Sequence, residues 1–98
     1  MRQMYQPIDS KGIESELCIL QEIASSIQKI NPIRRKDLVG IFQEMINANT
    51  LKNEALLDSL AAGLGKWLLM DLDLAETPFG EKSIELINRI LVGNARQQ

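Results

Sequence analysis

Hydrophobic residues recur at helical spacing along four segments of the chain, and no segment alternates with the two-residue period of a β-strand. The first segment, residues 10–30, places its apolar side chains on one stripe and its polar side chains on the opposite side. It is followed by Pro32, which disfavours a helical predecessor and lacks the N–H that would continue the helix. The pattern predicts an amphipathic helix over residues 10–30.

The second and fourth segments show the same period. Residues 33–47 carry one apolar arc, and the Asn-Ala-Asn-Thr sequence at positions 47–50 favours a short turn after it. Thr77-Pro78 is typical of a helix N-terminus, and Gly93-Asn94 favours a left-handed stop at the other end of that helix. We therefore predict helices over residues 33–47 and 78–92.

The third segment, residues 52–71, is the most apolar part of the chain and could cross a membrane, fill the core or face a partner. Its leucines cluster on about half of the helical circumference, with Leu60 near the centre of the arc. Charged residues at positions 58, 66 and 71 interrupt the run of roughly 20 apolar residues that a bilayer crossing needs. We therefore predict an amphipathic core helix and no membrane contact, with residues 71–76 as a connection.

Four amphipathic helices joined by short turns predict an all-α fold, a compact bundle in which each helix touches two neighbours. A length of 98 residues fits one domain, residues 1–98. Residues 1–9 contain Pro7 and no periodic pattern, so we expect a loose N-terminal arm there. Residues 94–98 are expected to form a polar C-terminal tail.

Composition narrows the possible chemistry. The chain has 11 basic and 13 acidic residues, a net charge of −2, so no overall positive field attracts nucleic acid. Histidine is absent and cysteine occurs once, which excludes an imidazole-based triad and disfavours a zinc site. A single cysteine and the lack of a secretory signal pattern favour a cytoplasmic location. We predict no catalytic residue, no cofactor and no metal, and a protein that is not an enzyme.

Asp71, Asp73 and Glu76 are the acidic residues of the predicted connection, and their oxygens could bind a hard cation. A calcium-binding loop needs more ligands at alternating positions and a glycine for its sharp turn, which this stretch lacks. We interpret the segment as a solvated acidic turn.

Arg34, Arg35 and Lys36 form the one basic cluster, which we name the basic corner. It could be merely solvated, could bind an acidic protein, or could contact phosphate, since the second and third helices resemble the general outline of a helix-turn-helix. The would-be recognition helix offers one lysine against Glu54 and Asp58, so its charge opposes DNA.

Leu69 lies about 180° from Leu60 on the helical wheel, on the same side as Ala55 and Ala62. Small neighbours would let another helix approach closely around one large side chain, so these three residues are the candidate interface of a homodimer. Our leading expectation is a small non-enzymatic regulator, adaptor or inhibitor that binds another protein. The alternative is a DNA-associated transcriptional regulator that uses the basic corner.

Overall fold

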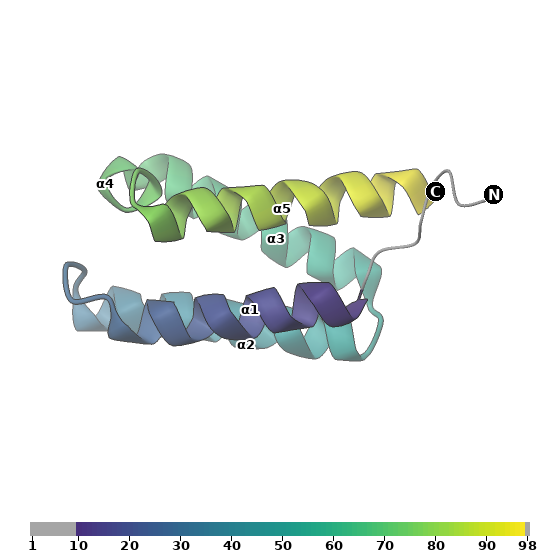
Figure 1. The fold of residues 1–98 in the computed structure, drawn as a ribbon, viewed down its shortest axis with the longest axis horizontal. Coiled ribbons are helices and arrows are strands. Elements are labelled where there is room, and N and C mark those ends of the chain that lie inside the picture. The colour runs from purple at the N-terminus through teal and green to yellow at the C-terminus, as the bar shows by residue number, and fades with distance from the viewer. Residues whose placement is uncertain (1–9, 98) are drawn as a thin grey trace.

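The computed structural model describes residues 10–97, and the N-terminal arm expected at residues 1–9 lies outside this range. The described chain is all-helical, as predicted, with helices α1 (Ser10–Ser26), α2 (Pro32–Thr50), α3 (Glu54–Met70), α4 (Leu72–Ala75) and α5 (Pro78–Gln97). The four long helices run alternately in opposite directions (Figure 1). Helices α1 and α3 each pack against both α2 and α5, so each long helix touches two neighbours, and α4 packs against α3 and α5.

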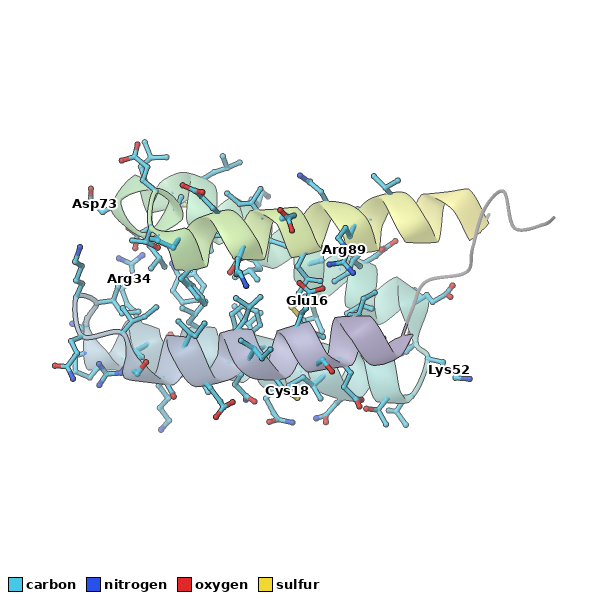
Figure 2. All side chains as sticks on the ribbon, viewed as in Figure 1. Glu16, Cys18, Arg34, Lys52, Asp73 and Arg89 are labelled. Carbon is cyan, nitrogen blue, oxygen red and sulfur yellow. The ribbon has the colours of Figure 1, made fainter. Side chains whose placement is uncertain are left out.

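The core contains the inward-facing side chains of all five helices. Phe42 of α2 is fully buried, and its ring meets that of Phe79 of α5 edge to face, with 5.9 Å between the ring centroids. A salt bridge between Arg89 of α5 and Glu16 of α1 lies at the surface between these two helices (Figure 2). Helix α5 is therefore joined to α2 by aromatic packing inside the bundle and to α1 by opposite charges at the surface.

Helix α1 is shorter than the predicted 10–30 and ends at Ser26, where two serine side chains bond to the backbone. The hydroxyls of Ser25 and Ser26 donate to the carbonyls of Glu22 and Ile23, at 2.7 and 2.9 Å. Such bonds compete with the helical ladder and favour its end. Residues 27–31 form the connection instead of a last helical turn.

Helix α2 begins where proline predicted, with the Asn31 side chain accepting the Ile33 N–H at 2.7 Å and Pro32 at the first helical position. The turn predicted at residues 47–50 is wrong, since the helix continues to Thr50 and buries Ala48. The chain turns away two residues after the helix, at Lys52, whose φ of 58° is left-handed. The N–H groups of residues 52 and 53 then satisfy the carbonyls of residues 49 and 48.

Helix α3 faces the core with a slightly different side from the one predicted. Its buried residues are Leu57, Ala61, Leu64 and Leu68, whereas Leu60 is half-buried at the margin of the core. The predicted arc followed the positions of the leucines and gave no weight to the small Ala61, which is fully buried. The centre of the buried side therefore lies between Leu57 and Leu68 on the helical wheel.

Two further boundaries differ from the prediction. Residues 72–75 of the predicted connection form the short helix α4, whose first turn is capped by the Asp71 side chain. At the other end of the chain, α5 continues through Gly93 to Gln97, so the polar tail predicted from residue 94 is helical up to residue 97. None of the described glycines has a positive φ. Alanine, arginine and glutamine at positions 95–97 are good helix formers, which outweigh the modest penalty of one glycine.

Candidate functional site

The outer side of α3 and the α4 segment after it expose apolar side chains. The predicted dimer residues Ala55, Ala62 and Leu69 are all exposed, and Leu69 has 74% of its surface accessible. Met70 and Leu72 continue the exposure at 82% and 60%. We call these five residues the α3–α4 face. Among the exposed residues of α3 from Ala55 onward, Lys66 is the one that carries a charge.

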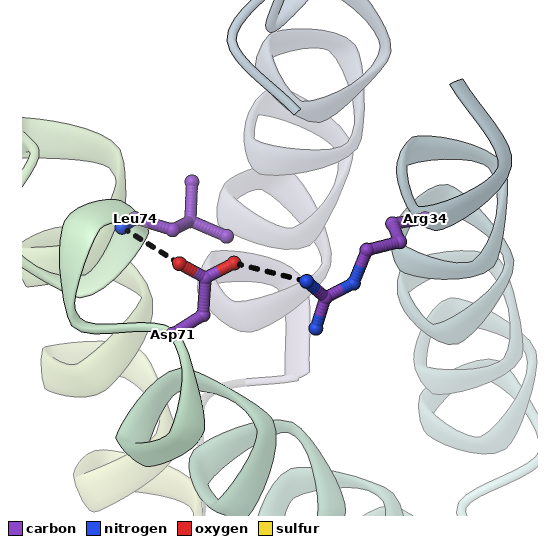
Figure 3. Close-up of polar contacts among 3 residues, drawn as sticks. All are labelled: Arg34, Asp71 and Leu74. Carbon is purple, nitrogen blue, oxygen red and sulfur yellow. Dashed lines mark hydrogen bonds and ion pairs between the residues drawn. The ribbon is translucent and has the colours of Figure 1, made fainter. Parts of the chain in front are cut away.

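The basic corner does not project freely into solvent. The Arg34 guanidinium lies over the ring of Trp67, 5.9 Å from its centroid, and its Nη1 is 3.9 Å from Oδ2 of Asp71 (Figure 3). Arg35 has a different partner, because its Nη1 donates to the carbonyl of Ile27 at 2.7 Å. The carbonyl at residue 27 belongs to the connection after α1, so Arg35 fastens that connection to α2. Lys36 is the third member and is exposed.

Asp71 connects the basic corner to the α3–α4 turn. Its Oδ1 accepts the Leu74 N–H at 3.3 Å, while its Oδ2 faces Arg34 (Figure 3). The first contact caps α4 and the second reaches α2, so one carboxylate defines both the start of α4 and its distance from α2. Its side chain is 18% exposed, against 55% for Arg34. Arg34 is therefore the more exposed partner of this ion pair.

A cavity of about 690 Å³ opens at this same end of the bundle. One wall is formed by the connection after α1 and the start of α2, with Lys29 and Arg34. The opposite wall comes from α4 and the start of α5, and it carries Asp71, Asp73 and Glu76. Arg34 and Asp73 mark the two walls in Figure 2. The cavity therefore lies between the α1–α2 connection on one side and α4 on the other.

The cavity is apolar inside and charged at its rim. Leu74 and Phe79 are buried in its lining, and Ile27 and Ile30 are half-buried there. Asp73 and Glu76 are exposed on one side and Lys29 on the other. This arrangement suits a ligand group that combines an apolar part with a polar end.

The acidic residues predicted to form a solvated turn thus line a cavity, and two of them are exposed. Across residues 10–97, no three histidine, cysteine, aspartate or glutamate side chains come close enough to hold a metal ion. Asp71, Asp73 and Glu76 lie along one wall of the cavity without forming such a group. Cys18 lies elsewhere, exposed on the outer side of α1 (Figure 2).

Sequence reasoning missed the contacts of Arg34 with Trp67 and Asp71. These residues are 33 and 37 positions apart along the chain, and no helical period relates one helix to another. A partial signal was present, because an aspartate three residues before Leu74 is a typical N-cap. That signal predicts α4 but does not predict that the second carboxylate oxygen reaches an arginine of α2.

The different contacts of Arg35 and Lys36 lead to a prediction. Replacing Arg35 with methionine keeps an unbranched apolar stem but removes the bond to the Ile27 carbonyl, so we expect the free energy of unfolding to fall by about 1–2 kcal/mol. The matched replacement of Lys36, an exposed neighbour, should change it by less than about 0.5 kcal/mol. Urea denaturation followed by circular dichroism measures both. Equal losses would show that the Arg35 contact contributes nothing specific.

None of the helices described between residues 10 and 97 has the length and apolar character needed to cross a membrane. Comparison of the chain with protein-family models, with curated proteins and with solved structures finds no match.

Proposed function

We propose that the protein is a small non-enzymatic regulator, an adaptor or an inhibitor, that binds another protein through the α3–α4 face. The observation that carries this proposal is the exposure of Leu69, Met70 and Leu72, at 74, 82 and 60%. Single exposed leucines are common on monomers, but consecutive large apolar side chains at one place are typical of interaction surfaces.

The composition of the face supports the same proposal. Interface centres are poor in charge and rich in methionine and other large apolar side chains, and the exposed side of α3 beyond Glu54 carries Lys66 as its one charge. Ala55 and Ala62 are small enough to let a partner helix approach closely, so that Leu69 and Met70 could enter the partner's surface. The exposed single cysteine fits the reducing cytoplasm that we propose as the location.

Pairing of two copies by a two-fold axis is the simplest form of this interaction, because the axis uses the same face twice. We expect a homodimer at micromolar concentration. Replacing Leu69 with glutamate would bury a charge at the centre of the interface, so we expect the dimer dissociation constant to rise at least about 30-fold. Light scattering measures the mass of both proteins, and circular dichroism should remain helical.

Val92 provides the matched control, since it is an apolar residue of α5 with 52% exposure and lies outside the α3–α4 face. The Val92→Glu variant should dimerise as the wild type does. A wild type that stays monomeric at high concentration, or a dimer that Leu69→Glu leaves intact, would refute self-association through this face.

The alternative, a DNA-associated regulator, has less support from the structure than from the sequence. Arg34 is engaged by Trp67 and Asp71, and Arg35 by the Ile27 carbonyl, so contact with phosphate would have to compete with these interactions. The nearby Asp73 and Glu76 add negative charge at the same end of the bundle. We expect duplex DNA to bind weakly and without sequence preference at physiological salt.

A further inference from the structure

We propose that the cavity between the α1–α2 connection and α4 receives a basic side chain, arginine or lysine, that a partner protein presents beside apolar residues. This inference rests on the proposed function, because it names the chemistry of a partner that binds at the α3–α4 end of the bundle. It concerns a separate feature, however, since the cavity residues are not those of the α3–α4 face.

The charge of the rim selects the sign of the ligand. Asp71, Asp73 and Glu76 contribute three negative charges, against two positive charges from Lys29 and Arg34. Arg34 and Asp71 are paired with each other, so their charges compensate, which leaves Asp73 and Glu76 against Lys29. Asp73 and Glu76 are exposed on the opposite wall from Lys29, which leaves an excess of carboxylate on the α4 side. A cation is attracted there, and an anion would meet like charges.

The interior of the cavity selects the rest of the ligand. Ile27, Ile30 and Phe79 offer apolar surface below the charged rim. Arginine and lysine bury their methylene stems along apolar surfaces while the charged end stays at a polar edge. Such a side chain can therefore pack its stem inside the cavity and place its charge between Asp73 and Glu76.

The carboxylates along this wall do not form a metal site instead. No group of three acidic, histidine or cysteine side chains within the described chain is arranged to hold one. A volume of about 690 Å³ is also much larger than an ion needs and lies in the range of cavities that bind organic groups. The size of the cavity therefore favours an extended organic side chain over an ion.

The test uses two capped tripeptides, N-acetyl-Leu-Arg-Leu-amide and N-acetyl-Leu-Glu-Leu-amide, titrated into the isotope-labelled full chain and followed by two-dimensional NMR. The peptides differ in the charge of one side chain. We expect the arginine peptide to shift amide signals of residues 27–31 and 73–79, with binding in the millimolar range and at least about tenfold tighter than that of the glutamate peptide.

The double variant Asp73→Asn, Glu76→Gln should bind the arginine peptide about three- to tenfold more weakly, since two exposed charge pairs are lost. Glu85→Gln, an exposed carboxylate of α5 outside the cavity, should leave binding unchanged. The proposal is overturned by equal binding of the two peptides, by shifts that lie outside the cavity, or by no shift with about 10 mM arginine peptide. None of these results involves a residue of the α3–α4 face, so protein binding through that face is tested separately.

Discussion

Replacing Phe42 with alanine should lower the free energy of unfolding by about 3–5 kcal/mol, because the ring is fully buried and the remaining cavity cannot be filled by its neighbours. The substitution also removes the edge-to-face contact with Phe79, which joins α2 to α5 across the bundle. Small domains have a total stability of only about 5–15 kcal/mol, so the variant should be close to unfolding at physiological temperature.

Chemical denaturation of the two proteins measures this difference directly. Ile33 provides a control on the same helix, since it is 72% exposed and its replacement by alanine should change the stability by less than about 0.5 kcal/mol. A loss below about 1 kcal/mol for Phe42→Ala would mean that the ring is not in the centre of the core.

Gly80→Ala should be the most destabilising of the small substitutions, with an expected loss of about 3 kcal/mol. A β-carbon at this position would lie 2.4 Å from the carbonyl oxygens of both Leu74 and Ala75. These are backbone atoms of α4, so the start of α5 would have to move away from α4 to accommodate the methyl group. Glycine is required here by a close approach of two chain segments and not by a special backbone conformation.

Gly63 is the matched control within a helix. A β-carbon there meets no atom within 4 Å, and the residue is exposed in the middle of α3. Gly63→Ala should therefore raise the stability by about 0.5–1 kcal/mol, since alanine has the higher helix propensity. Thermal unfolding of both variants separates the two cases. If both substitutions shift the melting temperature in the same direction, the contact of α5 with α4 is not as close as the structure places it.

The helical periods predicted the fold because they reflect burial, which dominates folding. The start of α2 followed from Asn31-Pro32, and the exposure of Ala55, Ala62 and Leu69 followed from their position on the wheel. Helix ends were predicted less well. Helix α1 ends at Ser26, before the proline, whereas the burial of Ala48 extends α2 through a sequence that locally favours a turn. Tertiary packing overrides the local conformational preference of the sequence at such positions.

The candidate site could be predicted only in part. The basic corner and the acidic turn were both visible in the sequence as charge clusters. Their contact depends on how α2 and α3 pack against each other, and no local sequence pattern predicts that packing. Arg34 therefore could not be recognised as a partner of Asp71 and Trp67. The cavity was equally hidden, because its walls come from segments more than 40 positions apart at their extremes.

Affinity capture from an extract of the native host, with quantitative mass spectrometry, tests most directly whether the α3–α4 face binds a protein. Three baits are compared: the wild type, the double variant Leu69→Glu, Met70→Glu, and Val92→Glu as the control on α5. We expect at least one protein to be captured by the wild type and by Val92→Glu, and at least about tenfold less by the double variant, because two charges would be buried in the contact. The same set of proteins on all three baits, or none on any of them, would contradict a partner-binding role for this face.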